Sequence, residues 1–318
     1  MSKHPPKTPM MQTRLDGRAI AVLLACCLIW GVQQTLIKAT LPYIAPIFQA
    51  ALRFIGGAVL LWLWCRARRV PLFNADGTLW PGLLAGALFT AEFVALYLGL
   101  LHTTAGRLTV FLYTAPFWVA LLVPLWTPAE RLHPKQWTGL ACAFAAVVFA
   151  LREGFTHGGV GLTWSGDLLG LLGGLLWGLT TVTQRATRLR QATPEKALFY
   201  LVAMAAVLLP LLSLALGEPW NWRWGGFAAT SMAFQVIVSA FASYLAWQWL
   251  LLRYPATRLS SFTFLAPLFA LLAGALWLHE PLSGSLVASM ALVAFGIVLV
   301  NRRQVIEDVI VEDAAGGA

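Results

Sequence analysis

Charged residues are scarce in this sequence: Asp, Glu, Lys and Arg make up only 11% of its 318 residues, against about 25% in soluble proteins. Cysteine is also rare. The four cysteines, Cys26, Cys27, Cys65 and Cys142, show neither metal-ligand spacing nor a disulfide pattern. The five histidines are scattered over loops and the ends of apolar runs. We therefore expect neither a metal site nor a cofactor.

Enzyme motifs are missing as well. The sequence contains no HExxH, no glycine-rich phosphate loop with its Lys, and no CxxC pair. Its net charge of +9 could suggest nucleic-acid binding, but the basic residues lie between apolar runs, where they act as topology signals. We therefore predict a protein that is not an enzyme and that binds no nucleic acid.

Long apolar runs dominate the chain instead. Hydrophobic residues account for 59% of it, and ten runs approach the roughly 20 residues that a helix needs to cross a bilayer. Backbone polar groups must be hydrogen-bonded inside lipid, so each run is expected to be a helix. The predicted spans are residues 18–39, 46–65, 80–101, 104–126, 134–151, 166–186, 196–216, 225–252, 255–278 and 282–300.

The chain also repeats itself. Residues 107–126 recur as residues 258–277, at a constant offset of 151 (258 minus 107). The identical pairs include Arg107 and Arg258, Pro116 and Pro267, and Trp126 and Trp277. Because each half holds five spans, an odd number, the two halves should have opposite orientations. We predict an all-α membrane protein with ten transmembrane helices arranged as a 5+5 inverted repeat.

The distribution of Lys and Arg predicts the orientation. With the N-terminus inside, 17 of them lie in cytoplasmic segments and only Arg107, Arg152 and Arg223 lie in outer loops. The predicted organisation is a disordered cytoplasmic N-terminus (1–17), a first repeat (18–151), a periplasmic linker (152–165), a second repeat (166–301) and a cytoplasmic tail (302–318). Both termini would then be cytoplasmic, in a bacterial inner membrane.

Several motifs resemble one known family. They are Trp30-Gly31 followed by Lys38, the pair Arg53-Phe54, and the matched pairs Ala115-Pro116 and Ala266-Pro267. Together they resemble the drug/metabolite transporter superfamily, in its ten-helix EamA-type branch, over nearly the whole of residues 18–303. The resemblance implies transport of small metabolites, often export of amino acids, through a central cavity lined mainly by spans one, three, four, six, eight and nine.

Glu92 is the only acidic residue deep inside an apolar run. A charge at the bilayer centre costs about 2.5 to 3.5 kcal/mol on insertion scales, so such a residue normally faces a cavity or a partner. Burial also favours its protonated form. Glu92 could bind a proton or a substrate ammonium, or it could be a neutral hydrogen-bonding residue between packed helices.

Aromatic and polar residues at helical spacing suggest the rest of a substrate site. The predicted substrate-binding residues, Glu92 included, are Trp30, Gln34, Glu92, Tyr113, Trp177, Thr181, Gln184, Ser239, Ser243 and Tyr244. Such a stripe must face protein or water rather than lipid. The alternative for the tryptophans is helix packing at the Trp-Gly steps, where Gly31 and Gly178 allow close approach.

Four further residues are candidates for gating. Pro116 and Pro267 each remove a backbone hydrogen bond and can bend their helices, while Arg107 and Arg258 could latch opposite gates, with Glu280 as one partner. Static kinks and interfacial anchoring are the alternatives. Arg53, two turns into the second span, needs a partner, and a structural ion pair is expected.

We therefore expect a secondary transporter, an exporter, that moves small metabolites such as amino acids by alternating access, with a proton link through Glu92. Its partners would be a small-molecule substrate and the lipid bilayer, and a homodimer is left open. The alternatives are a nucleotide-sugar or multidrug carrier of the same superfamily, or a non-transporting membrane scaffold.

Overall fold

The computed structural model describes residues 15–128, 131, 132, 134, 136–142, 144, 145, 149, 164–221, 224–278, 288, 291, 292 and 295. Over these residues all regular structure is helical, and seven helices are long and apolar enough to cross a membrane. The predicted all-helical membrane class is confirmed. The predicted span 282–300 and the two predicted tails lie wholly or largely outside the described residues, as does most of the linker. Of the predicted span 134–151, residues 134, 136–142, 144, 145 and 149 are described, and all of them are helical.

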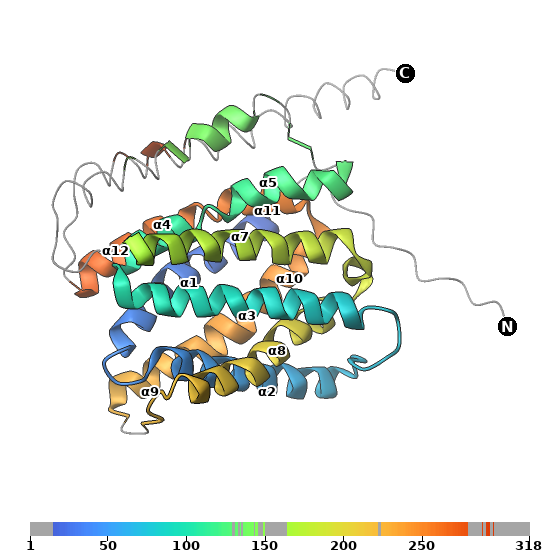
Figure 1. Ribbon diagram of the computed structural model, residues 1–318. Helices are drawn as coiled ribbons and strands as arrows, with labels where there is room; N and C mark the ends of the chain where they lie inside the picture. Colours follow the sequence, from blue (N-terminus) through green and yellow to red (C-terminus); the bar gives the residue numbers. More distant parts are fainter. Residues whose placement is uncertain are drawn as a thin grey trace, which may run out of the picture.

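Figure 1 shows the helices in chain order. Their bounds are α1 Gly17–Thr40, α2 Pro46–Arg68, α3 Leu79–His102, α4 Ala105–Leu112, α5 Ala115–Trp126, α7 Trp164–Ala186, η2 Arg188–Gln191, α8 Pro194–Ala215, α9 Gly226–Ala233, η3 Phe234–Ser243, α10 Tyr244–Arg253, α11 Ala256–Phe262 and α12 Leu265–Leu278. Helix α7 lies between α3 and α5, and α2 lies beside α8.

Two of the predicted spans are broken at matching places. Span 104–126 divides into α4 and α5 at Tyr113 and Thr114, and span 255–278 divides into α11 and α12 at Thr263 and Phe264. Each break comes a few residues before a proline, Pro116 or Pro267, whose ring clashes with the preceding turn and whose nitrogen cannot donate. Both copies of the repeated sequence therefore contain a helix break just before the proline.

The predicted span 225–252 contains a feature that helical spacing alone does not reveal. Its middle, η3, is a π-helix of 10 residues between α9 and α10, and the three segments form one 28-residue span. A π-helix makes wider turns than an α-helix and is frequent at functional sites. It lies directly before Tyr244, and it holds Gln235, Ser239 and Ser243 in buried positions.

Glycines set the closest approaches between helices. A Cβ added at Gly31 of α1 would lie 2.5 Å from Cβ of Phe269 in α12, and one at Gly178 of α7 would lie 2.5 Å from Cβ of Trp118 in α5. Phe269 and Trp118 are separated by the same offset of 151 (269 minus 118) as the repeated segment. The two Trp-Gly steps are thus close-packing points, as the packing alternative predicted for their glycines.

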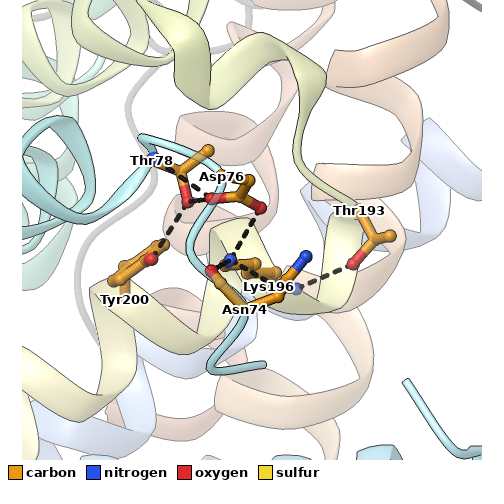
Figure 2. A network of polar contacts seen from close by, with 6 residues as sticks. All are labelled: Asn74, Asp76, Thr78, Thr193, Lys196 and Tyr200. Carbon is orange, nitrogen blue, oxygen red and sulfur yellow. Dashed lines mark hydrogen bonds and ion pairs between the residues drawn. The ribbon is translucent and has the colours of Figure 1, made fainter. Parts of the chain in front are cut away.

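Helix α8 is tied near its start to the loop that follows α2 (Figure 2). The ammonium group of Lys196 donates to Oδ2 of Asp76 and Oδ1 of Asn74, both at 2.7 Å. Oδ1 of Asp76 accepts from the Thr78 hydroxyl at 2.6 Å, and that hydroxyl shares a hydrogen bond of 3.0 Å with Tyr200. Partial burial raises the pKa of Asp76, but the hydrogen bonds from Lys196 and Thr78 outweigh this effect and lower the pKa to about 2.

The opposite ends of the same two helices are tied in a matching way. Helix α2 begins at Pro46 without a side-chain cap of its own. The carboxylate of Glu218, just after α8, accepts the backbone N–H groups of Ile47 and Phe48 at 3.0 and 2.8 Å. An acidic residue after each helix therefore contacts the start of the other, so α2 and α8 run antiparallel.

Candidate functional site

A buried cavity lies between α1, α3, the α4–α5 break, α7, α8 and α10. Its volume is about 60 Å³, which is room for several water molecules. The lining residues are Trp30, Gln33 and Gln34; Phe89, Glu92, Phe93 and Leu96; Leu112 and Tyr113; Trp177, Thr180, Thr181 and Gln184; Leu198 and Leu201; and Tyr244, Trp247 and Gln248. Eight of the ten residues that the sequence suggested for substrate binding lie on this wall.

Glu92 supplies the carboxylate of the cavity. It projects from the middle of α3, and only 6% of its surface is exposed. Within the described part of the chain, no hydrogen bond or ion pair to this carboxylate is formed. Arg53 acts on it electrostatically without an ion pair. The interhelical hydrogen bond that a purely structural role for Glu92 would need is therefore not formed among the described residues.

Aromatic rings form much of the remaining wall. The Trp30 ring lies 5.8 Å from that of Trp177 and 5.2 Å from that of Trp247, both edge to face, and Tyr113 lies 5.2 Å from Trp177 in the same geometry. The Trp30 indole donates a hydrogen bond of 2.9 Å to the Ser243 hydroxyl. The ring of Trp30 is thus held in place by neighbours on α7, η3 and α10, and aromatic walls of this kind can bind an apolar group or a cation.

Three glutamines add amide groups to the wall without completing their own hydrogen bonds. The side-chain oxygens of Gln34, Gln184 and Gln248 are buried, and none has a hydrogen-bond partner among the described residues. A buried amide without a partner is costly unless water or a ligand satisfies it. Thr181 also faces the cavity, although its hydroxyl donates to the Trp177 carbonyl in its own helix, at 3.1 Å. The wall therefore has free hydrogen-bond acceptors for a polar ligand.

Arg53 lies behind this wall with no exposed surface. Its Nη2 donates to Oε1 of Gln33 at 2.9 Å, to the Ser239 hydroxyl at 3.2 Å and to the Tyr244 hydroxyl at 2.5 Å. The guanidinium also lies 5.0 Å from the centre of the Phe93 ring. The ion pair expected for Arg53 is wrong within the described residues, because all these partners are neutral.

Two predicted site residues support the wall instead of lining it. Ser239 donates a hydrogen bond to Oε1 of Gln33, and Ser243 holds the indole of Trp30. The π-helix directs both hydroxyls toward α1 rather than into the cavity. A polar stripe in a sequence indicates which face is buried, but not whether that face meets a cavity or another side chain.

Three of the four predicted gating residues, Pro116, Arg258 and Pro267, are not part of the cavity wall. Pro116 and Pro267 are buried directly after the two helix breaks, and Arg258 is half-buried in α11. The side chain of Arg107 and all of Glu280 lie outside the described residues. Their proposed gating roles stay predictions.

Comparison with known proteins identifies the family. The model of the EamA-like transporter family matches residues 17–152 and again residues 164–302. This chain belongs to the EamA-like transporter family. A transporter of Synechocystis sp. that is named only as uncharacterized is 30% identical, with 92% of each chain covered. A protein of Salmonella typhimurium named as a probable amino-acid metabolite efflux pump is 27% identical, with 90% of this chain and 94% of that protein covered.

The fold of this EamA-like chain also matches a solved crystal structure. The TM-score is 0.74 and the identity 22%, with 91% of this chain and 99% of the other covered. The resemblance read from the sequence motifs is therefore confirmed. The chain is a multi-pass membrane transporter rather than an enzyme, with a small-molecule substrate and a lipid environment.

Sequence reasoning missed several wall residues of this EamA-like transporter. Gln33 stands beside the predicted Gln34, and Gln248 follows Tyr244 by one helical turn, so helical spacing could have found Gln248. The apolar wall residues, such as Phe89, could not be predicted from the sequence, because they resemble any other apolar residue of a span. Only the packing of the helices shows which apolar side chains meet a cavity.

Proposed function

We propose that this chain is a secondary transporter that exports small amine-bearing metabolites, such as amino acids, by alternating access. The observation that carries the proposal is the carboxylate of Glu92, unpaired among the described residues, on the wall of a cavity lined by aromatic rings. A buried carboxylate without a partner attracts an ammonium group or a proton. The probable amino-acid metabolite efflux pumps among the relatives support the same substrate class and direction.

The proposed architecture is ten transmembrane helices in two inverted repeats, residues 18–151 and 166–301. The family model matches each half separately, both copies of the repeated segment contain a helix break, and the two Trp-Gly steps pack against repeat-related residues. Inverted repeats with broken helices near the bilayer midplane are typical of secondary transporters. The orientation proposed from Lys and Arg puts both termini in the cytoplasm of a bacterial cell, with the protein in the inner membrane.

The broken helices are the proposed moving parts. Tyr113, at the break between α4 and α5, lies on the cavity wall, so bending at Pro116 would change the cavity directly. Pro267 follows the equivalent break in the other repeat. Opening one break and closing the other would expose the cavity to each side in turn, with Arg107 and Arg258 as proposed latches.

A proton link through Glu92 is part of the proposal. The titratable groups around its carboxylate are Arg53 of α2, Tyr113 at the break and Tyr244 of α10. Of these, only Arg53 carries a charge near neutral pH, and it forms no ion pair with Glu92. Proton binding and ammonium binding would then compete for the same carboxylate, which couples their movements.

The test is counterflow in proteoliposomes with amino acids, a nucleotide sugar and a cationic dye, each at two pH values. We expect counterflow of amino acids, and stimulation by a pH gradient that Glu92→Gln abolishes. Glu195→Gln, the same change in the first turn of α8, is the matched control and should behave like the wild type. Counterflow of only the nucleotide sugar or the dye would favour the alternative carriers, and no counterflow at all would favour a scaffold. Unchanged pH stimulation in Glu92→Gln would remove the proton role.

A further inference from the structure

We propose that the Arg53 network is a second recognition pole of the cavity, one that binds a carboxylate of the substrate while Glu92 binds its ammonium group. This inference rests on the proposed transport function and adds to it a residue that selects for the negative end of the molecule. The residues that carry it are Arg53, Gln33 and Tyr244, on three different helices.

The first observation is an incompletely satisfied buried cation. Arg53 is fully buried, and its Nε and Nη1 atoms have no hydrogen-bond partner among the described residues. Its third nitrogen is shared between three neutral oxygens. A buried guanidinium without a counterion is strongly unfavourable, so such a residue is normally paired or serves a function. A negative charge brought near it would be stabilised.

The second observation is the direction of the hydrogen bonds. Arginine can only donate, so the oxygens of Gln33 and Tyr244 that face Arg53 must accept. Oε1 of Gln33 accepts from Ser239 as well, which fixes the orientation of the amide. The amide nitrogen of Gln33 carries two protons and the Tyr244 hydroxyl one. One of these three joins the two side chains to each other, and the other two are left as donors, with no further acceptor among the described residues. Both side chains line the cavity.

The result is a cavity with two unlike poles. Glu92 presents a carboxylate, whereas Gln33 and Tyr244 present donors that are polarised by the positive charge behind them. Glu92 lines the cavity and Arg53 lies behind its wall, and within the described residues the two form no ion pair with each other. A guest that carries an ammonium and a carboxylate on one carbon skeleton satisfies both poles at once, and its apolar part can rest on Trp30 and Trp177.

The test compares amino acids with their amides, which keep the ammonium group and lose the negative charge. Uptake of labelled L-phenylalanine, L-leucine and L-threonine into proteoliposomes is measured beside uptake of L-phenylalaninamide, L-leucinamide and L-threoninamide. The wild type should prefer the acids. In Arg53→Gln the ratio of acid to amide uptake should fall by about tenfold or more, because a charge-assisted contact is lost. Uptake of the amide should be retained.

Two further variants keep the test decisive. Tyr244→Phe removes one donor and preserves the ring, so the same ratio should fall even if Arg53→Gln does not fold. Arg66→Gln, at the exposed end of α2, is the control and should leave the ratio unchanged. An equal loss of acid and amide uptake in both Arg53→Gln and Tyr244→Phe would show a structural role and overturn the proposal.

The two levels of the proposal fail in different ways. If the wild type carries acids and amides equally well, the transport function stands and the carboxylate pole is wrong. If the wild type carries none of the six compounds, the proposed amino-acid function fails, and the carboxylate pole falls with it.

Discussion

Replacing Gly31 by alanine tests a close contact between two helices, α1 and α12. The new Cβ would lie 2.5 Å from Cβ of Phe269, 2.7 Å from the carbonyl oxygen of Ala266 and 2.8 Å from the backbone nitrogen of Ala270. Carbon atoms in contact prefer about 3.5 to 4.0 Å. Two of the three atoms belong to the backbone of α12, so no side-chain rotation relieves the clash, and α1 and α12 must separate by about 1 Å.

The size of the effect follows from two opposing terms. Overpacking of this kind costs about 1 to 3 kcal/mol, whereas alanine is favoured over glycine in a helix by about 1 kcal/mol. Gly17→Ala is the matched control, because Gly17 begins the same helix and a Cβ there would meet nothing within 4 Å. The difference in stability between the two variants therefore isolates the clash, at about 1 to 3 kcal/mol.

Thermal unfolding of the detergent-purified variants measures this difference. At about 2 to 4 °C per kcal/mol, Gly31→Ala should unfold at least about 2 °C below Gly17→Ala. Gly178→Ala, where the new Cβ would lie 2.5 Å from Cβ of Trp118, should be destabilised in the same way. If Gly31→Ala unfolds at or above the temperature of Gly17→Ala, then α1 and α12 do not touch at Gly31 and the packing described here is wrong.

Two further predictions concern the ties between α2 and α8. Asp76→Asn should lower stability at pH 6 by about 1 kcal/mol, a value reduced for solvent screening of a carboxylate that is 33% exposed. The folded-state pKa of Asp76 is lowered to about 2 from 3.8, so its stabilising effect is present above about pH 4 and is lost as the pH falls toward 2. The unfolding temperatures of wild type and variant should therefore converge near pH 2. A difference that stays constant with pH would contradict the role of the Lys196 ion pair. Glu218→Gln should cost about 1 kcal/mol, because the charge that caps Ile47 and Phe48 at the start of α2 is removed; unchanged unfolding would rule out this cap.

The composition and the repeat in the sequence were enough to predict much of this molecule. Spans of about 20 apolar residues must be helical in lipid, since no water satisfies their backbone. Glu92 stood out because a carboxylate is costly at that depth, and the Trp-Gly steps stood out because they occur twice. Seven described spans and the family membership agree with these predictions.

The breaks and the π-helix show where prediction from the sequence stopped. Pro116 and Pro267 indicated bends, but a proline does not say whether a helix curves or divides. The π-helix from Phe234 to Ser243 has no simple signal, because an extra residue per turn is accepted only where the surrounding helices favour it. Ser239 and Ser243 belong to this π-helix, and they lie behind the cavity wall instead of on it.

Local sequence thus determined what each segment is: its length, its helical state and its few costly polar groups. The tertiary structure alone decided which of these groups share a cavity and which satisfy each other behind it. Arg53 is the clearest case. Its charge is visible in the sequence, but its neutral partners come from α1, η3 and α10, and hydrogen bonds between helices far apart in the chain exist only once those helices have packed.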